Sequence, residues 1–568
     1  MKRIYKYLAV ALAVTPLVSC DDFIDDNRFP LDEQTNNPTY WNNASNVTNQ
    51  CNTFYNQFYG YGRGDSGGLF YYKTLSDDQA GNSFQTWANT NVPTSSSNWS
   101  NPFTEIRRAN YIINNVRTST LTDNEKANFE GIARLNRAWQ YFQLVRMYGD
   151  IQWINVVVDP ADEAVTYGAR DDRDVVMDSV LADLNYACAA IATKASKTAW
   201  SKDMANAMKA DICLWEGTFC KYRTAAENGK AADSERASKF LKECVTACEN
   251  VMNAGYEVGT AIEDYQATYN SVSLSGNNNV IFFKEYKNTL MYHSLIAYTC
   301  SSTQISGMTK DAFDSYLFKD GKPLALTSEN KSDVGEVDAN GDYSIAKLLE
   351  VRDARLSKTI DPIVFYDGMS WARNGAMEMT SSTGYGCCKY DNVDLPLDNR
   401  VNTVKNYTCA PIFWLEVVYC NYAEAKAELG TITDADLNKS INKLYARAGL
   451  PALTANVGFS DPANNWGVSD IIWEVRRCRR CELMFDNWFR YWDLVRWHKL
   501  DKLDSTKNPN ILLGANMTAA PVEIGNVNGY VDGSHGGTRV FEARQYLYPV
   551  PKGEINLNKN LTQNPLWK

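Results

Sequence analysis

Two irregular stretches of this sequence contain the side chains best suited to hold a polar ligand. Within about 60–100 and 256–410, aromatic rings stand beside amides and arginines, and helical periodicity fades. The apolar C–H faces of a sugar ring stack on flat aromatic faces, and its hydroxyls need amide, carboxylate or guanidinium partners. Because loops this long usually bind something, they predict a saccharide site. The candidate residues are Tyr72, Asn82, Trp87, Asn89, Tyr298, Trp371, Arg373 and Tyr385.

Trp87 and Trp371 are the leading pair among these candidates. An indole offers the largest stacking area at a low cost in entropy, so both rings are expected to be exposed. Either ring can instead anchor its loop on a helical core. Four tryptophans of the predicted helices are assigned to the core: Trp139, Trp215, Trp488 and Trp492.

Motifs for catalysis are missing from the sequence. Its three histidines, His293, His498 and His535, lie far apart. No nucleophile-and-base motif, glycine-rich phosphate loop or metal-spaced histidine pair occurs. We therefore expect that the protein is not an enzyme. Paired carboxylates for glycoside hydrolysis stay open as an alternative, since any acidic chain offers candidates.

One segment begins like a calcium loop. Asp338, Asn340 and Asp342 alternate as oxygen donors, but the glycine comes too early and Leu349 stands where a bidentate glutamate is needed. We expect a turn there and no cofactor, with a bound calcium ion as the alternative. Cys478 and Cys481 have helical spacing, which favours buried free thiols over a zinc site.

A cluster of arginines invites a nucleic-acid interpretation that the charge balance opposes. The chain has 57 Lys and Arg against 67 Asp and Glu, a formal net charge of −10, whereas phosphate binding needs a basic excess. An apolar stripe runs through the same segment and predicts a helix over about 469–499, packed on the core. Acidic residues one turn away can pair with the arginines, which are Arg476, Arg477, Arg479 and Arg480.

The first residues resemble an export signal. Lys2 and Arg3 precede a short apolar run that is too short to span a bilayer, and the run ends in Leu-Val-Ser-Cys20, which resembles a lipobox. Acyl chains on Cys20 would anchor the protein, and ordinary secretion is the alternative. The acidic residues that follow resemble surface-export signals of Gram-negative gut bacteria. We therefore expect a signal peptide at 1–19, a flexible acidic tether at 20–35 and a position on the cell surface.

The remainder, 36–568, is expected to fold as one mainly α unit. Amphipathic periodicity predicts a helical scaffold over about 103–255 and 410–500, with loop-rich, ligand-binding regions over about 60–100 and 256–410. The helices pair like tetratricopeptide repeats, which stack because each pair buries its apolar face only on its neighbours. A strand is predicted at 280–283. The predicted helices lie near 124–148, 173–193, 203–223, 235–254, 412–429, 434–447 and 469–499.

Motifs in order along nearly the whole chain resemble one family. The segment from Gly131 to Gly149 carries an arginine and an Ala-Trp-Gln-Tyr-Phe core and ends in Tyr-Gly, which resembles a helix of the SusD/RagB family. Two departures are Cys478, where the family usually has glutamate, and one extra residue between Glu482 and Arg490. Further matches are Trp99 with Ile106 and Asn110, Tyr422–Ala425 with Glu428, Asn442 with Arg447–Pro451, Asp493–Trp497, and the ending Tyr546–Pro551 with Glu554, Gln563–Pro565 and Trp567.

The resemblance implies a fold and a role. It implies four tetratricopeptide-like helix pairs that support a more irregular, ligand-carrying part. It also implies an outer-membrane lipoprotein that binds oligosaccharide or polysaccharide as part of glycan uptake and delivers it to a SusC-like TonB-dependent transporter. Some relatives take peptides, so a receptor of the same fold for peptides or another nutrient is the alternative. The aromatic and amide residues of the loops favour sugar.

Overall fold

Helices dominate the structure, a computed structural model that describes residues 37–81, 86–159, 161–193, 196–300, 306–368, 379–521 and 526–567. The helices predicted from periodicity are confirmed, with two exceptions given below. The long helices are α5 (Ser97–Thr118), α6 (Asp123–Tyr148), α8 (Arg173–Ala190), α9 (Lys202–Tyr222), α11 (Ser234–Met252) and α18 (Leu415–Glu428). Shorter helices include α4 (Ala44–Asn52), α12 (Ile262–Asn270), α13 (Leu295–Cys300), α14 (Lys310–Ser315), α16 (Ala354–Thr359), α17 (Leu397–Val401) and α23 (Lys552–Leu557).

Local sequence signals set the ends of α6. Thr122 and Glu125 form a reciprocal capping box at its start, which satisfies two backbone N–H groups that have no partner within the helix. At its end, Gly149 adopts a positive φ of 72°, which a glycine tolerates without a steric penalty. The helix therefore begins and ends where its sequence predicts.

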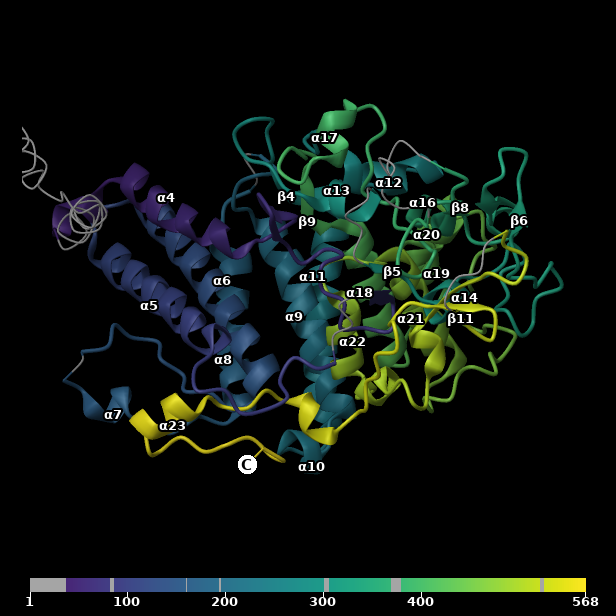
Figure 1. The fold of residues 1–568 in the computed structure, drawn as a ribbon. Helices are drawn as coiled ribbons and strands as arrows, with labels where there is room; N and C mark the ends of the chain where they lie inside the picture. The colour runs from purple at the N-terminus through teal and green to yellow at the C-terminus, as the bar shows by residue number, and fades with distance from the viewer. Residues whose placement is uncertain are drawn as a thin grey trace, which may run out of the picture.

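The long helices pack in consecutive pairs. Helix α5 packs on α6, α6 on α8, α9 on α11, and α18 on both α11 and α21 (Asp470–Glu482). Figure 1 shows α5, α6, α8, α9 and α11 side by side in one half of the molecule. The predicted mainly α fold of paired helices is confirmed.

A strand pair joins this scaffold to the loop-rich half. Strand β4 (Val280–Lys284) pairs antiparallel with β9 (Ala410–Trp414), and β9 leads directly into α18. Phe58 packs on Phe282 and Phe413, with ring centroids 5.5 and 6.0 Å apart. The predicted strand at 280–283 is confirmed, and it is covered on the side of the helical core.

The loop-rich half has its own core, in which tyrosine is the most frequent residue. Tyr61, Tyr71 and Tyr343 are fully buried, and each hydroxyl donates to a backbone carbonyl at 2.7–2.8 Å. A buried phenol needs such a partner. Many tyrosines of this chain are therefore structural. Short antiparallel ribbons surround this core: β1 (Gly62–Arg63) with β2 (Ser66–Gly67), β3 (Gln79–Gly81) with β5 (Ser306–Met308), β6 (Glu336–Val337) with β7 (Tyr343–Ser344) and β8 (Ile363–Phe365), and β10 (Leu513–Asn516) with β12 (Tyr530–Asp532) and β11 (Asn526–Val527).

The predicted continuous helix over 469–499 is wrong. The chain forms α21 (Asp470–Glu482) and α22 (Phe489–Arg496), and Phe485, Asn487 and Trp488 between them have positive φ. The Lys389 ammonium donates to the Met484 carbonyl at 2.9 Å, and the Tyr390 hydroxyl donates to the Phe485 carbonyl at 3.1 Å. These side chains from another segment replace the hydrogen bonds that a helix would have supplied.

The predicted helix over 434–447 is also divided. It consists of α19 (Asp434–Asn438) and α20 (Ile441–Arg447). The Ser440 hydroxyl donates to the Asp436 carbonyl at 2.6 Å, at the turn between them. Serine side chains compete with the backbone in this way, which explains the break.

The carboxy-terminal segment returns to the helical half and runs along the ends of its helices (Figure 1). The backbone N–H of Tyr548 donates to the Met147 carbonyl at 2.7 Å, and Arg170 donates to Asn564 at 2.7 Å. In the ranges that the structure describes, no helix has both the length and the apolar character that crossing a bilayer requires.

Candidate ligand-binding surface

Trp87 is an anchor for its loop. The indole is only 9% exposed, its Nε1 donates to the Val540 carbonyl at 2.7 Å, and its ring packs edge-on against Phe541. The ring surface that would stack on a sugar is covered by the chain itself. The expected exposure of Trp87 is therefore wrong, and the alternative of a loop-anchoring aromatic describes it.

Tyr385 is likewise buried, at 1% exposure. Its ring lies parallel to Phe313 with centroids 4.6 Å apart, in the tyrosine-rich core. The expected exposure of Tyr385 is wrong for the same reason. Asn89 is half-buried, and its backbone carbonyl accepts a hydrogen bond from Gln545 at 3.1 Å, which ties this loop to the carboxy-terminal segment.

Other candidate residues lie outside the described residues. They are Asn82, Trp371 and Arg373, together with the lipid-attachment residue Cys20. Their predicted roles stay predictions.

Tyr72 and Tyr298 are brought together by the fold. Their rings, both half-buried, meet edge-to-face with centroids 5.8 Å apart at an angle of 73°. The Tyr72 hydroxyl lies 2.9 Å from the Ser294 hydroxyl. We call Tyr72 and Tyr298 the tyrosine ledge. It has the aromatic faces and the hydroxyl groups that a sugar needs.

Local backbone geometry turns Tyr72 toward the surface. Tyr71 has a positive φ of 59° and is fully buried, so the next side chain points the other way. Gly67 lies against the Tyr72 ring, where an added Cβ would come within 2.7 Å of it. A glycine is therefore required for the ring to lie there.

His293 stabilises the segment that carries the Tyr298 side of the ledge. Its Nε2 donates to the Thr408 carbonyl at 3.0 Å, and its Nδ1 accepts from the Leu295 N–H at 3.1 Å, at the start of α13. Burial lowers the pKa of His293 to about 3. The ring is therefore neutral at physiological pH and holds α13, which carries Tyr298, in place.

The two phenols of the ledge stay protonated. Burial raises the pKa of Tyr72, and burial together with the Asp65 carboxylate raises the pKa of Tyr298. Both hydroxyls can therefore donate hydrogen bonds at neutral pH.

The sequence reasoning missed residues around the ledge. Asp65 is exposed at the tip of the β1–β2 hairpin, beside Tyr298. The Gly64 N–H donates to the Tyr292 carbonyl at 2.8 Å, which holds this hairpin against the segment before α13. An aspartate among the closely spaced glycines of 60–68 was the available signal, because it marks a tight hairpin with a polar tip.

The arginines of α21 are buried in ion pairs, but mostly with acidic residues of other segments rather than with those predicted one turn away. Arg476 contacts Glu428 at 2.7 Å, and Arg479 contacts Asp493 at 2.8 Å. Arg480 contacts Asp78 at 2.8 Å. This face is a buried ion-pair network, which confirms the interpretation of a core-packed helix.

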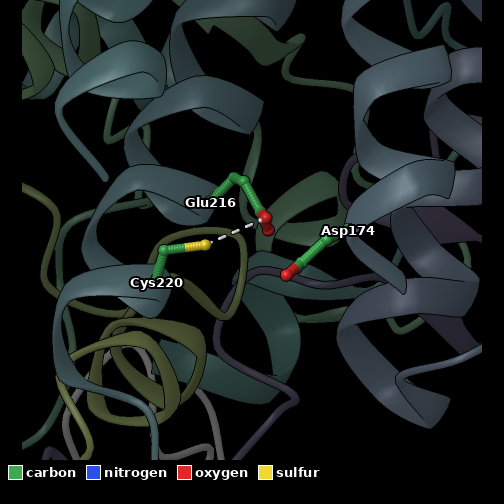
Figure 2. A group of neighbouring side chains, drawn as sticks. All are labelled: Asp174, Glu216 and Cys220. Atoms are coloured by element: carbon green, nitrogen blue, oxygen red, sulfur yellow. Dashed lines mark hydrogen bonds between the residues drawn. The ribbon is translucent and has the colours of Figure 1, made fainter. Parts of the chain in front are cut away.

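One group of side chains has a spacing suited to a metal ion. Figure 2 shows Asp174, Glu216 and Cys220, the only such group found among the described residues. A guanidinium group already binds both carboxylates: Arg173 donates to Asp174 at 2.7 Å and to Glu216 at 2.9 Å. The Cys220 thiol donates to Glu216 at 3.2 Å, and burial raises its pKa. A cysteine must lose its proton to bind a metal ion, and both carboxylates are already paired with arginine, so this arrangement does not fit a metal ion.

The calcium-like segment forms a turn. The Asp338 carboxylate accepts from the backbone N–H groups of Asn340 at 2.8 Å and Asp342 at 3.1 Å. The predicted turn is confirmed. Calcium binding at this turn stays untested.

Two family models match this chain. A model described as the SusD family matches residues 276–567, and one described as starch-binding, associating with the outer membrane, matches residues 66–214. The first covers more than half of the 568 residues.

One related protein and several solved structures are similar to this chain, and they too are described as SusD-like. The SusD-like protein P2 of Formosa agariphila is 30% identical over 162 residues, which are 28% of this chain and 31% of that relative's length. A SusD-like protein from Bacteroides fragilis superposes with a TM-score of 0.68 at 21% identity, covering 93% of this chain and 98% of its own. A laminarin-binding SusD-like protein superposes with a TM-score of 0.53 at 17% identity, covering 92% and 99%.

These matches bear on the fold and the family. The likeness of the solved structures extends over nearly the whole chain, so the fold is that of SusD-like proteins. The family suggested by the sequence motifs is confirmed by the family model. This chain belongs to the SusD family.

Proposed function

We propose that this protein binds oligosaccharide or polysaccharide at the cell surface and delivers it to a SusC-like TonB-dependent outer-membrane transporter. The observation that carries the proposal is the match of the SusD family model over more than half of the chain. The second model, described as starch-binding and associating with the outer membrane, supports the same role.

The tyrosine ledge supports a saccharide as the ligand. Two half-buried rings at 73° offer faces in two directions, and protonated hydroxyls lie beside the Asp65 carboxylate. Such a mixture of ring faces, donors and acceptors matches a sugar better than a peptide, which would call for exposed strand edges or charged clamps. A structural neighbour named as laminarin-binding supports this choice.

Anchoring completes the proposed role. Acyl chains on Cys20 would hold the protein at the outer membrane, and the acidic tether at 20–35 would let it reach the transporter. We expect the protein to bind the glycan without cleaving it, because the sequence shows no nucleophile-and-base motif and buried ionisable groups are engaged in the fold. His293, for example, is fully buried with both ring nitrogens engaged.

Native gel electrophoresis tests the proposal. The purified full-length protein is run through gels that contain laminarin, starch, xylan, pectin or alginate, and each polysaccharide is also assayed for new reducing ends. We expect slower migration in at least one gel and no reducing ends. Unchanged migration in all of them, with binding to a peptide library instead, would favour the alternative of a peptide receptor. Released reducing ends would favour a glycoside hydrolase.

A further inference from the structure

A second concave surface lies apart from the tyrosine ledge. It is a cleft of about 580 Å³ between α14, the loop around 461–466 and the segment 499–510. That volume falls within the roughly 300–1,000 Å³ of typical ligand sites. We call it the indole cleft and define it by the lining residues Asn465, Trp466, Trp473, Lys499, Asp501 and Asn510.

Two indoles form its aromatic wall. Trp466 and Trp473 meet edge-to-face at 89° with centroids 5.2 Å apart, and both are half-buried. The Trp473 Nε1 donates to Asp461 at 3.1 Å, and the Arg490 guanidinium lies 5.8 Å from the Trp466 ring. These contacts fix the rings on one side and leave part of each ring uncovered.

Two arginines form the floor of the indole cleft, and both are already paired with carboxylates of the protein. Arg490 binds the buried Asp77 carboxylate with two hydrogen bonds of 2.7 and 2.8 Å. Arg480 binds Asp78 at 2.8 Å and Asp311 at 2.9 Å. The positive charges of these arginines are therefore neutralised, and the floor of the cleft is not an anion-binding site.

The rim carries polar groups that the rest of the protein does not engage. Over the ranges that the structure describes, no ion pair or hydrogen bond reaches the side chains of Asn465, Lys499, Asp501 or Asn510. They offer amide donors and acceptors, one ammonium and one carboxylate, with opposite charges in balance. Uncovered indole faces beside unengaged amides suit the C–H faces and hydroxyls of a neutral sugar.

We propose that the indole cleft is a second saccharide-binding site, which binds the same neutral glycan as the tyrosine ledge. The inference rests on the proposed function. Figure 1 shows α13, which carries Tyr298, near the top of the loop-rich half, and α14 and α21, which line the cleft, well below it. The two sites are thus separate, and one polysaccharide chain long enough to reach both would be bound at two points.

A glycan microarray and calorimetry test the inference. The full-length protein and its variants are applied to arrayed laminarin, starch, xylan, pectin and alginate, and the retained glycan is then titrated as an oligosaccharide. In a chain that already carries Tyr298→Ala, we expect Trp466→Ala to weaken the remaining binding by about tenfold or more. A second variant, Asn465→Ala with Asn510→Ala, removes only rim amides and tests the same site without touching an indole. The matched control is Trp139→Ala, a half-buried indole of α6 that packs on Phe142.

The outcomes separate this inference from the proposed function. If glycan is retained but binding is indifferent to Trp466→Ala and to the double asparagine variant, the cleft is no saccharide site and the proposed function stands. If the unaltered protein retains no glycan, both the proposed function and the inference of a second saccharide site are wrong. If an arrayed peptide is retained and Trp466→Ala releases it, the cleft is a peptide site and the inference is overturned.

Discussion

At the scale of single residues, Tyr298 should be the most informative position of the ledge. Tyr298→Ala removes one ring of the edge-to-face pair with Tyr72 and the hydroxyl beside Asp65. Loss of one stacking ring and its hydrogen bond should weaken glycan binding by about tenfold, with an unchanged melting temperature. Calorimetric titration with the retained glycan measures this. Tyr186→Ala, a half-buried tyrosine of α8 under Arg134, is the control, and equal affinities of the two variants would contradict the ledge.

The ledge shows how far the sequence predicts a site. Tyr72 and Tyr298 were found because they are tyrosines in irregular stretches, and the fold brings them together. Trp87 and Tyr385 met the same criterion, yet their rings are covered by Phe541 and Phe313. Whether a loop aromatic stays exposed depends on contacts with distant segments, which composition does not contain. Trp466 and Trp473 were missed because they flank the start of a helix and were not in a stretch singled out as a loop.

His293 predicts a pH dependence of stability. Its pKa is about 3 in the folded protein against an ordinary 6.5, so the unfolded chain binds the proton more tightly. The stabilising contribution of the neutral ring is present above pH 6.5 and is lost as the pH falls toward 3, by at most about 1.4 kcal/mol per pH unit. Urea unfolding gives the free energy of unfolding at several pH values between 3 and 6.5. This free energy should change less steeply with pH for His293→Asn than for the unaltered protein. His535→Asn, at an exposed position, should leave the slope as it is, and a parallel response of both variants would refute the assignment.

At the scale of elements, the break between α21 and α22 depends on a buried ion pair. Lys389 and Asp486 are fully buried and 2.8 Å apart, and the same ammonium binds the Met484 carbonyl. Lys389→Met leaves a buried carboxylate without its partner and should lower the free energy of unfolding by about 3–5 kcal/mol. Lys389→Met with Asp486→Asn should recover part of that loss, because no charge is then buried. Urea unfolding of the unaltered protein, of Lys389→Met, of Asp486→Asn and of the double variant measures this, and strictly additive losses would contradict the pairing.

The same break marks the limit of element prediction. The periodicity that located α6, α8, α9 and α11 also continues through Phe485, Trp488 and Trp492, so it predicts one helix where there are two. The apolar side chains are buried either way. What ends α21 is the set of hydrogen bonds from Lys389 and Tyr390, nearly a hundred residues earlier in the chain. The extra residue between Glu482 and Arg490 was the one local sign of the interruption.

At the scale of the whole molecule, the anchor should decide where the protein resides. Cys20→Ser removes the thiol that acylation requires, while the rest of the chain keeps its sequence. We expect the variant to leave the outer-membrane fraction and to bind the isolated glycan as tightly as before. Metabolic labelling with a palmitate analogue and fractionation of the cells measure this. An unlabelled wild-type protein would contradict acylation at Cys20.

Two separate binding surfaces on one molecule should make affinity depend on the length of the glycan. Once a polysaccharide occupies the tyrosine ledge, its binding to the indole cleft becomes intramolecular and gains from a high effective concentration. A short oligosaccharide cannot reach both sites. We therefore expect its affinity to be at least about tenfold lower than that of the polymer, when the concentrations of both ligands are expressed as oligosaccharide-length segments. Tyr298→Ala or Trp466→Ala alone should each abolish this advantage, since one remaining site treats both ligands alike. Equal affinities of polymer and fragment for the unaltered protein would mean that a single site holds the glycan.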